Sequence, residues 1–174
     1  MVSRILQHLL KTEEEKYFRK LSKNIKVGKG FVFQFHPSAK LTVEKDVELR
    51  SYVSIWVGKN ARLKIGQNVF INNHCSINCL KNIEIGENTL FGEGVKVYDH
   101  NHEYSFEKEQ LNVNRKEFTY GEVKIGKNCW LGSNVVVLKG VSIGENSIIG
   151  AGCVIHKDIP ANSVIVARQD LISK

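Results

Sequence analysis

A repeat of six residues dominates the C-terminal part of the chain. Residues 125–160 divide into the blocks IGKNCW, LGSNVV, VLKGVS, IGENSI, IGAGCV and IHKDIP. Each block opens on a branched aliphatic residue, and most fifth positions are small or β-branched: Ile125, Leu131, Val137, Ile143, Ile149 and Ile155, then Cys129, Val135, Val141, Ser147 and Cys153. This period fits neither an α-helix, with its apolar period of about 3.6, nor a half-buried strand, with its period of about 2. It is typical of hexapeptide repeats, in which short strands and turns stack as the coils of a β-helix.

We therefore predict an all-β fold, a parallel β-helix with about three blocks, or roughly 18 residues, in each coil. The period continues upstream with two short offsets, through Val43, Leu49, Ile55 and Ala61, then Ile65, Ile71, Ile77 and Ile83, then Ile85, Phe91 and Val97. Openers and fifth positions should point into the core, and Gly or Asn should occupy corners, where a positive φ is needed. An irregular first coil is expected from about residue 25, where bulky residues alternate.

The N-terminal segment has a different pattern. Residues 3–23 carry apolar side chains at spacings of three and four, which predicts a helix capped by Ser3. Three glutamates one turn before Lys16, Arg19 and Lys20 favour i,i+4 ion pairs. We divide the chain into a helical cap, residues 1–24, and a β-helix domain, residues 25–174, because the open end of a solenoid needs cover. A helix lying on a membrane surface is the alternative, and the three consecutive glutamates weaken it.

The period breaks at residues 98–122, YDHNHEYSFEKEQLNVNRKEFTYGE. We predict a protruding loop at about 100–122, and long loops of this kind are often functional. The densest set of reactive side chains in the chain is Asp99, His100, Asn101 and His102. A general base is one interpretation of the histidines, a polar loop surface is another, and a metal site lacking an evident third ligand is a third. No P-loop, GxGxxG or nucleophile elbow is present.

Composition narrows the classes of function. The chain has 174 residues, of which 42% are hydrophobic and 25% charged, and a formal net charge of +7. Because the lysines are spread over turns, a phosphate-rich cofactor is a better anionic partner than nucleic acid. No signal peptide is recognisable in residues 1–20, so a cytoplasmic location is expected. The cysteines form no CxxC pair, and buried free thiols are preferred to metal ligands: Cys75, Cys79, Cys129 and Cys153.

The stretch IGKNCWLGSNVVVLKGVSIGENSIIGAGCVIHKDIP, with its tryptophan at Trp130, resembles the hexapeptide-repeat acyltransferases. The nearest group is that of the galactoside, maltose and nodulation O-acetyltransferases. The resemblance covers about residues 60–162 and is strongest in 65–102 and 125–160. It implies a left-handed parallel β-helix, a homotrimer, acetyl-CoA as co-substrate and a carbohydrate acceptor. The hand follows from the resemblance alone, since the general rule for parallel crossovers predicts the opposite.

The resemblance also implies catalytic and acceptor-binding residues. The family's catalytic histidine follows an I-G-D-N segment by about fourteen residues, and counting from Ile85 places it at His102, with His100 as runner-up. The family's acceptor-facing asparagine matches Asn72, and His74 replaces a second asparagine. Asp99 and Tyr104 complete the expected acceptor contacts, and the loop's other aromatic residues suit stacking on sugar rings.

Cofactor contacts follow in the same way. Trp130 matches the family's tryptophan near the thioester, and Ser133 matches the serine after it. The stretch that lines the pantetheine arm and nucleotide maps to Ala151, Gly152 and Lys157. The family's G-x-P-A/C-[RK] loop is replaced here by Val-Ala-Arg-Gln-Asp, which leaves Arg168 as the candidate for the 3′-phosphate. Purely structural interpretations remain open for Trp130 as a gap-filling aromatic, Lys157 as a solvated lysine and Asn72 as a corner residue.

These observations predict an O-acetyltransferase. Acetyl-CoA would donate to a carbohydrate hydroxyl by general-base catalysis, without a covalent enzyme intermediate, in a cleft between neighbouring prisms of a trimer. A surface polysaccharide or its precursor is the first expectation for the acceptor. The alternatives are an N-acetyltransferase acting on an amino sugar or antibiotic, and an inactive β-helix scaffold subunit.

Overall fold

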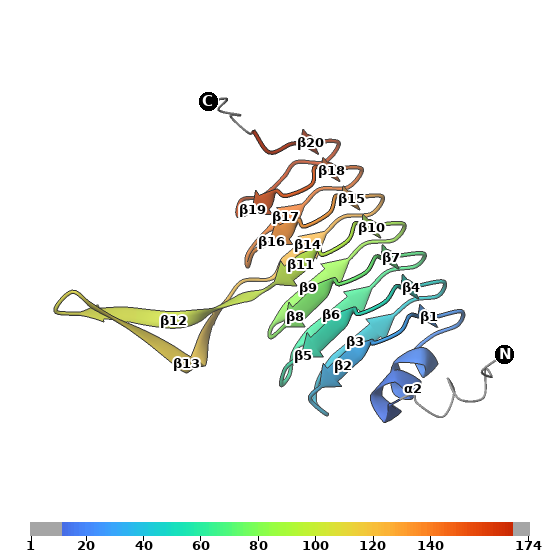
Figure 1. The fold of residues 1–174 in the computed structure, drawn as a ribbon, viewed down its shortest axis with the longest axis horizontal. Coiled ribbons are helices and arrows are strands. Elements are labelled where there is room, and N and C mark those ends of the chain that lie inside the picture. The colour runs from blue at the N-terminus through green and yellow to red at the C-terminus, as the bar shows by residue number, and fades with distance from the viewer. Residues whose placement is uncertain (1–11, 169–174) are drawn as a thin grey trace, which may run out of the picture.

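The computed structural model describes residues 12–168 and shows a stack of coils (Figure 1). Successive coils contribute one short strand to each of three parallel sheets, except at the C-terminal end, and the sheets are the walls of a prism. Strands in one wall pair with the equivalent strands of the coils before and after them. For example, Phe70 of one coil aligns with Leu90 of the next. The predicted all-β, parallel β-helix is therefore confirmed.

The three sheets contain seven, six and five strands. Sheet A consists of β1 (Lys26–Val27), β4 (Glu48–Leu49), β7 (Phe70–Ile71), β10 (Leu90–Phe91), β15 (Trp130–Leu131), β18 (Ile148–Ile149) and β20 (Val164–Ile165). Sheet B consists of β2 (Val32–Phe35), β5 (Ser54–Val57), β8 (Ser76–Cys79), β11 (Lys96–Tyr98), β16 (Val136–Val137) and β19 (Val154–Ile155). Sheet C consists of β3 (Lys40–Val43), β6 (Arg62–Ile65), β9 (Asn82–Ile85), β14 (Val123–Ile125) and β17 (Ser142–Ile143).

The interior of the prism is filled by the residues that the period of six selects. All the predicted openers and fifth positions are buried, including the polar Ser147. The hydroxyl of Ser147 donates to the carbonyl oxygen of Pro160 at 3.1 Å, which satisfies it in the core. All four cysteines are free and buried, as predicted. Burial raises the pKa of the Cys75 thiol to about 11, so this thiol stays protonated at neutral pH.

Coil length changes along the stack. Equivalent corner residues of adjacent coils are 22 apart for Ser51 and Asn73 but 18 apart for Asn128 and Asn146. The predicted coil of about 18 residues therefore holds only for the C-terminal coils. The N-terminal coils are longer because their strands in sheets B and C have four residues, as β5 and β6 do, where β16 and β17 have two.

One corner of the prism is built by a column of asparagines. Asn68, Asn88, Asn128, Asn146 and Asn162 all have positive φ. The side-chain amide of each of the first four donates to the next side chain in the column, with N–O distances of 3.0 to 3.2 Å. Asparagine tolerates this backbone conformation better than other residues with a Cβ, and the amide ladder ties successive coils together.

The N-terminal helix is shorter than predicted in the described residues. Helix α2 spans Glu13–Lys20 and is capped by the Thr12 hydroxyl, which accepts from the amide of Glu15 at 3.1 Å. The predicted cap, Ser3, and the first part of the predicted helix lie outside the described residues. Phe18 is fully buried against two phenylalanine rings of the first coil, so α2 covers apolar surface there. The Glu15–Arg19 pair, at 2.9 Å, confirms one i,i+4 contact.

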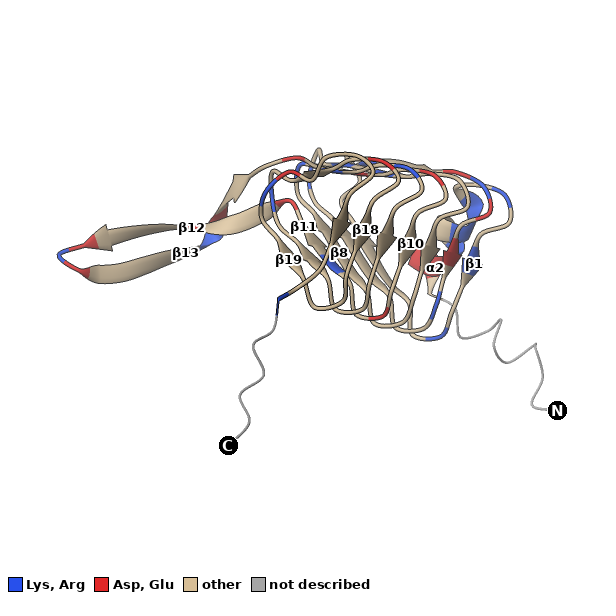
Figure 2. Ribbon diagram, turned by 90° about the horizontal axis from the view of Figure 1, so that it is seen from above, with Lys and Arg blue, Asp and Glu red and all other residues tan. Residues whose placement is uncertain are grey.

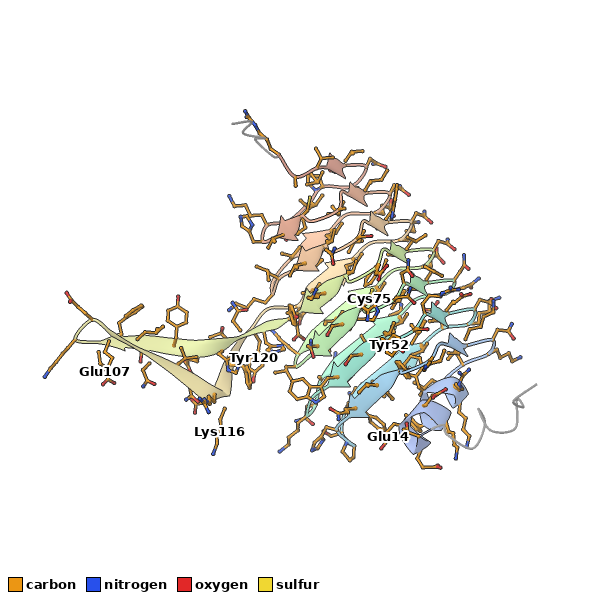
Figure 3. The ribbon with its side chains drawn as sticks, in the orientation of Figure 1. Glu14, Tyr52, Cys75, Glu107, Lys116 and Tyr120 are labelled. Atoms are coloured by element: carbon orange, nitrogen blue, oxygen red, sulfur yellow. The ribbon has the colours of Figure 1, made fainter. Side chains whose placement is uncertain are left out.

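The segment predicted as a loop is instead an antiparallel β-hairpin, called the arm below. It consists of β12 (His100–Glu107) and β13 (Gln110–Tyr120) and projects from the prism between β11 and β14 (Figures 1 and 3). Glu107 lies near its tip and Tyr120 near its root (Figure 3). The turn residues Lys108 and Glu109 have φ of 47° and 67°, as a tight hairpin turn requires. Backbone pairing within the arm thus replaces the missing repeat.

Candidate functional site

The root of the arm is fixed by Asp99, which is fully buried. Its carboxylate accepts hydrogen bonds from the amides of Leu80, Lys81 and Asn82 at 2.7 to 3.0 Å, and from His100 Nδ1 at 3.0 Å. Burial alone would raise the pKa of Asp99, but the bonds from His100 and the amides outweigh it and hold the pKa below its ordinary value. Asp99, predicted to contact the acceptor, therefore lies inside the protein and joins the arm to the preceding coil.

His100 is held among aromatic rings. Because the ionised carboxylate of Asp99 only accepts, Nδ1 of His100 carries the proton between them. The imidazole meets the rings of Trp56, Tyr98 and Phe118 edge to face, with centroid distances of 6.4, 6.4 and 5.2 Å. Its side chain is only 12% exposed, so His100 has little freedom to reorient toward a ligand.

His102 is exposed and lies at an irregularity in the arm. The strand register shifts between His102 and Tyr104, and β13 bulges opposite this point. The bulge brings the carbonyl oxygen of Asn114 to 3.0 Å from Nδ1 of His102. A carbonyl oxygen can only accept, so Nδ1 is the protonated nitrogen and the lone pair is on Nε2. The imidazole packs on Phe118 at 4.6 Å, which fixes its plane.

The carbonyl that orients His102 is itself fixed by the Asn114 side chain. Its Oδ1 accepts from the amides of Lys116 and Glu117 at 2.9 and 3.2 Å. Its Nδ2 donates to the carboxylate of Glu117 at 2.9 Å. The bulge is thus a closed turn with a defined carbonyl direction. The sequence alone gives no signal for this contact, because residues 102 and 114 meet only through the hairpin register.

Several predicted ligand-binding residues lie at another corner, between sheets A and B, called the glycine corner below. Its residues from successive coils are linked by backbone hydrogen bonds from Gly94 to Asn73 and from Gly152 to Ser133. It holds the predicted acceptor contacts Asn72 and His74 and the predicted cofactor contacts Ser133, Ala151 and Gly152.

Two of the predicted acceptor contacts at this corner have structural partners. Asn72 accepts the amide of Asn73 through its own Oδ1 at 2.8 Å, which supports the corner interpretation of that residue. His74 has a φ of 59° and stacks on Tyr52 with a centroid distance of 5.0 Å. These contacts fix the outward surface of the glycine corner.

Trp130 lies on the outer face of sheet A and is 52% exposed. Register aligns it with outward apolar residues of neighbouring coils, a row called the apolar ridge below: Phe70, Leu90, Trp130, Ile148 and Val164. Of the remaining cofactor candidates, Lys157 is exposed and lies past β19, after sheet B, while Arg168 follows β20. The structure therefore splits the predicted set over different parts of one chain. His102 follows the end of β11, at the corner between sheets B and C, away from the glycine corner.

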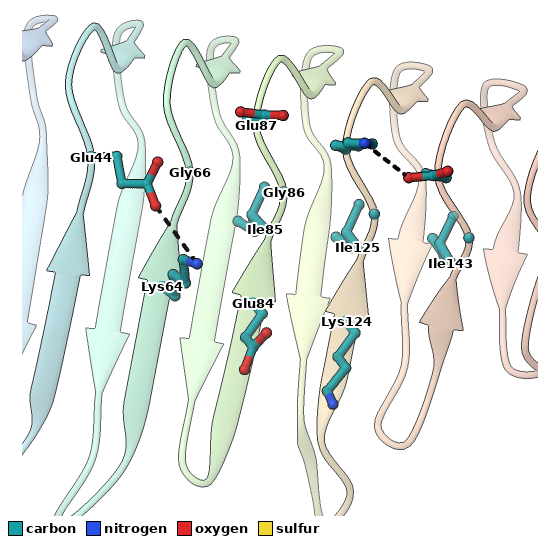
Figure 4. A pocket seen from close by; sticks show the side chains of 14 residues that line it. Glu44, Lys64, Gly66, Glu84, Ile85, Gly86, Glu87, Lys124, Ile125 and Ile143 are labelled. Atoms are coloured by element: carbon teal, nitrogen blue, oxygen red, sulfur yellow. Dashed lines mark ion pairs between the residues drawn. The ribbon is translucent and has the colours of Figure 1, made fainter.

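Charged residues of both signs are mixed along the coil corners (Figure 2). One groove of about 400 Å³ runs across several coils and is lined by paired charges such as Lys64 and Glu44, 3.6 Å apart (Figure 4). Glycines in it mark close packing, since a Cβ at Gly86 would lie 2.5 Å from the amide nitrogen of Lys127. None of the predicted site residues lines this groove.

Comparisons with known proteins agree with this geometry. Residues 122–157 match the family described as bacterial transferase hexapeptide (six repeats). Galactoside O-acetyltransferase from Escherichia coli (strain K12) is 34% identical over 149 residues, covering 79% of this chain and 71% of the relative. The chain belongs to the hexapeptide-repeat acetyltransferases.

Two solved structures have a similar fold. A maltose O-acetyltransferase from Clostridium difficile 630 has a TM-score of 0.52 and 26% identity, over 92% of this chain and 77% of that one. An N-acyltransferase from Bacillus cereus, solved with dTDP and coenzyme A, has a TM-score of 0.63 and 18% identity, over 86% of this chain and 81% of that one. The second similarity shows the fold only. Proteins that share this architecture thus include one named as an O-acetyltransferase and one named as an N-acyltransferase.

Sequence reasoning missed three residues around the histidines of this hexapeptide-repeat acetyltransferase. Phe118 packs on both imidazoles, Asn114 orients His102, and Trp56 contacts His100. Only Trp56 had a usable signal, because the alternation in SIWV places it outward between the inward Ile55 and Val57. Among the described residues, no three His, Cys, Asp or Glu side chains gather as a metal site, and no helix has the length and apolarity to cross a membrane.

Proposed function

We propose that this acetyltransferase transfers the acetyl group of acetyl-CoA to a hydroxyl of a carbohydrate, with His102 as general base. The observation that carries the proposal is the fixed tautomer of His102. The Asn114 carbonyl holds the proton on Nδ1, which directs the basic Nε2 lone pair outward at the root of the arm. The names of the relatives, galactoside and maltose O-acetyltransferase, support a sugar hydroxyl as the acceptor.

The proposed reaction needs no covalent enzyme intermediate. The acceptor oxygen attacks the thioester carbonyl carbon while Nε2 of His102 takes the hydroxyl proton. The tetrahedral intermediate then collapses, the carbon–sulfur bond breaks, and the proton passes from His102 to the departing CoA sulfur. Ser133 or a backbone amide at the glycine corner is the proposed donor to the oxyanion. The products are an acetyl ester and free CoA, so atoms and charge balance.

The donor is proposed to lie along the glycine corner and the apolar ridge. Trp130 offers an exposed indole for the thioester end, and the surface around it is open. At Gly152, which has a φ of 74°, an added Cβ would meet nothing within 4 Å, so the backbone there is accessible to the pantetheine arm. Ser133 and Ala151 lie on the same corner, and Lys157 and Arg168 are the proposed phosphate contacts. The net charge of +7 favours such a polyanion.

The assembly is proposed to be a homotrimer with active sites between chains. The proposal is supported by the position of the proposed base and the proposed donor residues at different corners of one chain, which a neighbouring chain would bring together. The apolar ridge and the arm both expose apolar side chains, including Leu90, Phe106 and Leu111. Asn72, His74 and Tyr104 are the proposed acceptor contacts, with Asp99 acting through His100. A cytoplasmic location and a surface polysaccharide or its precursor as acceptor complete the proposal.

The test is the substitution His102→Ala. We expect kcat to fall by about 10²–10⁴-fold, because a positioned general base contributes that much. Acetyl-CoA affinity, measured by isothermal titration, should stay within about twofold, since the donor residues are unchanged. His36→Ala is the matched control, because His36 is an exposed histidine on the first coil, bonded only locally to Ser38.

Three results would contradict the proposal. A His102→Ala variant with full rate would remove His102 as the base. A His100→Ala variant with the same loss and normal acetyl-CoA binding would move the base to His100. A product that resists mild base would be an amide and not an ester, which would make the enzyme an N-acetyltransferase.

A further inference from the structure

Trp56 is an exposed aromatic residue beside the two histidines. It lies in β5, where Ile55 and Val57 point into the core and are fully buried, while Trp56 points outward and is 38% exposed. Its indole meets the His100 ring edge to face at a centroid distance of 6.4 Å. His100 and His102 both contact Phe118, so these rings form a continuous patch from Trp56 to the proposed base.

The neighbours of Trp56 on the outer face of sheet B are polar. Register pairs Trp56 with Gln34 on one side and Asn78 on the other, and Tyr98 follows on the next coil. The Asn78 amide donates to the Ser76 hydroxyl at 3.0 Å, which orients its plane. The arrangement is one aromatic face between two side-chain amides. The core does not require it, because the inward residues of β5 already fill the interior.

This chemistry suits a sugar ring. A pyranose has an apolar face of C–H groups that stacks on indole, and its edge hydroxyls pair with planar amides. Scattered exposed apolar residues need no explanation, but a large aromatic side chain beside a proposed catalytic base does. The adjacent coils are separated by about 4.8 Å, which is close to the width of one pyranose ring.

We propose that Trp56 is the platform on which a pyranose ring of the acceptor stacks, with Gln34 and Asn78 bonding its hydroxyls. The inference rests on the proposed function and adds a specificity determinant on the prism wall, outside the arm. Trp56 binds the acceptor and takes no part in proton transfer. Its loss therefore weakens acceptor binding and leaves the donor side unchanged.

The chain offers a direct spectroscopic test, because it contains only two tryptophans, Trp56 and Trp130. A Trp130→Phe variant has Trp56 as its single indole, and a Trp56→Phe variant reports on Trp130 alone. Titrating the first with maltose or methyl β-D-galactopyranoside should change its emission saturably. Titrating the second with acetyl-CoA should change the emission of Trp130. A Trp56 signal that stays flat with both sugars would overturn the inference, whether or not acetyl-CoA binds.

Kinetics give a second readout. Trp56→Ala should raise the KM for the acceptor by about tenfold, the size expected for one lost stacking contact and its buried area. The KM for acetyl-CoA should not change, and kcat should stay within about threefold. Trp56→Phe should recover part of the acceptor affinity. Val32→Ala is the matched control, because Val32 is exposed on the same face of sheet B at the N-terminal end.

The outcomes separate this inference from the proposed function. If wild-type enzyme acetylates a sugar but Trp56→Ala keeps a normal acceptor KM, the inference fails and the proposed function stands. A loss of the oligomer in Trp56→Ala, with normal acceptor KM in the remaining assembly, would likewise make Trp56 an interface residue. If wild-type enzyme acetylates no sugar, the proposed function fails, and the fluorescence titration still decides whether Trp56 binds one.

Discussion

At the scale of single residues, the carboxylate of Asp99 is fully buried and therefore needs hydrogen-bond donors from the protein. Three backbone amides and one imidazole donate hydrogen bonds to it. A buried donor without a partner costs about 1–3 kcal/mol of stability. Asp99 therefore holds the root of the arm against the turn at Leu80, and with it the position of His100.

The substitution Asp99→Asn should lower the free energy of unfolding by about 1–3 kcal/mol at neutral pH. The new side-chain amide would direct its own N–H toward a backbone N–H, which leaves a buried donor without an acceptor. The pH dependence follows from the lowered pKa of Asp99. A depressed carboxyl pKa gives stability that is fully present above the ordinary value of 3.8 and is lost as pH falls below it. Urea unfolding at fixed protein concentration, repeated toward pH 3 or so, should show this loss in wild type and a smaller one in the variant.

The control for that measurement is Asp158→Asn. Asp158 is exposed and accepts a hydrogen bond from the backbone amide of Ser142 at 2.8 Å. It should show a much smaller change in unfolding free energy. An equal loss of unfolding free energy in the two variants would mean that the burial of Asp99 and its several hydrogen bonds contribute no extra stability.

Asn114 allows a prediction about orientation. Asn114→Ala keeps the backbone carbonyl that binds His102 but removes the side-chain bonds to Lys116 and Glu117 that direct it. We expect kcat to fall by roughly fivefold, which corresponds to about 1 kcal/mol, the net worth of a typical hydrogen bond. The pH profile of kcat/KM should also shift, while acetyl-CoA affinity stays constant. Asn112→Ala, on the same exposed strand, is the control, and an unchanged rate for Asn114→Ala would assign the bulge a purely structural role.

At the scale of secondary-structure elements, the period of six predicted the inward positions of the prism but not the greater length of its N-terminal coils. Inward positions could be predicted because each short strand has only one face that avoids water, so burial repeats with the coil. The arm could not be predicted from that period, because its strands pair with each other and not with the stack. A signal was nevertheless present: Tyr104 and Phe106, then Leu111 and Val113, alternate on either side of a two-residue turn. The turn residues are Lys108 and Glu109, not the usual Asn-Gly, which obscured it.

The candidate site was less predictable than the fold for a related reason. His102 was reached by counting along a resemblance, and its role stays a prediction. Its partner Asn114 is set by a strand bulge, and Trp56 and His100 meet across coils of different length. Such contacts depend on register and corner length, which a hydrophobic pattern does not specify.

At the scale of the whole molecule, the proposed base and the proposed donor-binding residues of one chain lie apart. The arm with His102 leaves the prism at the corner between sheets B and C, whereas the glycine corner lies between sheets A and B, and Trp130 lies on sheet A. The apolar ridge beside Trp130 runs along successive coils and remains uncovered in a single chain. In the proposed cyclic trimer, a heterologous contact would bring the arm of each chain to the glycine corner of the next.

A shared site makes a prediction that a site within one chain does not. His102→Ala and Trp130→Ala chains should each be nearly inactive alone, because each lacks one half of the site. When they are refolded or co-expressed together in equal amounts, about a quarter of the interfaces in random trimers pair an intact His102 with an intact Trp130. Acetyl transfer should then rise to about that fraction of the wild-type rate. Activity no greater than the sum of the two parent variants would show that His102 and Trp130 serve the same chain, because every site would then carry one of the two substitutions.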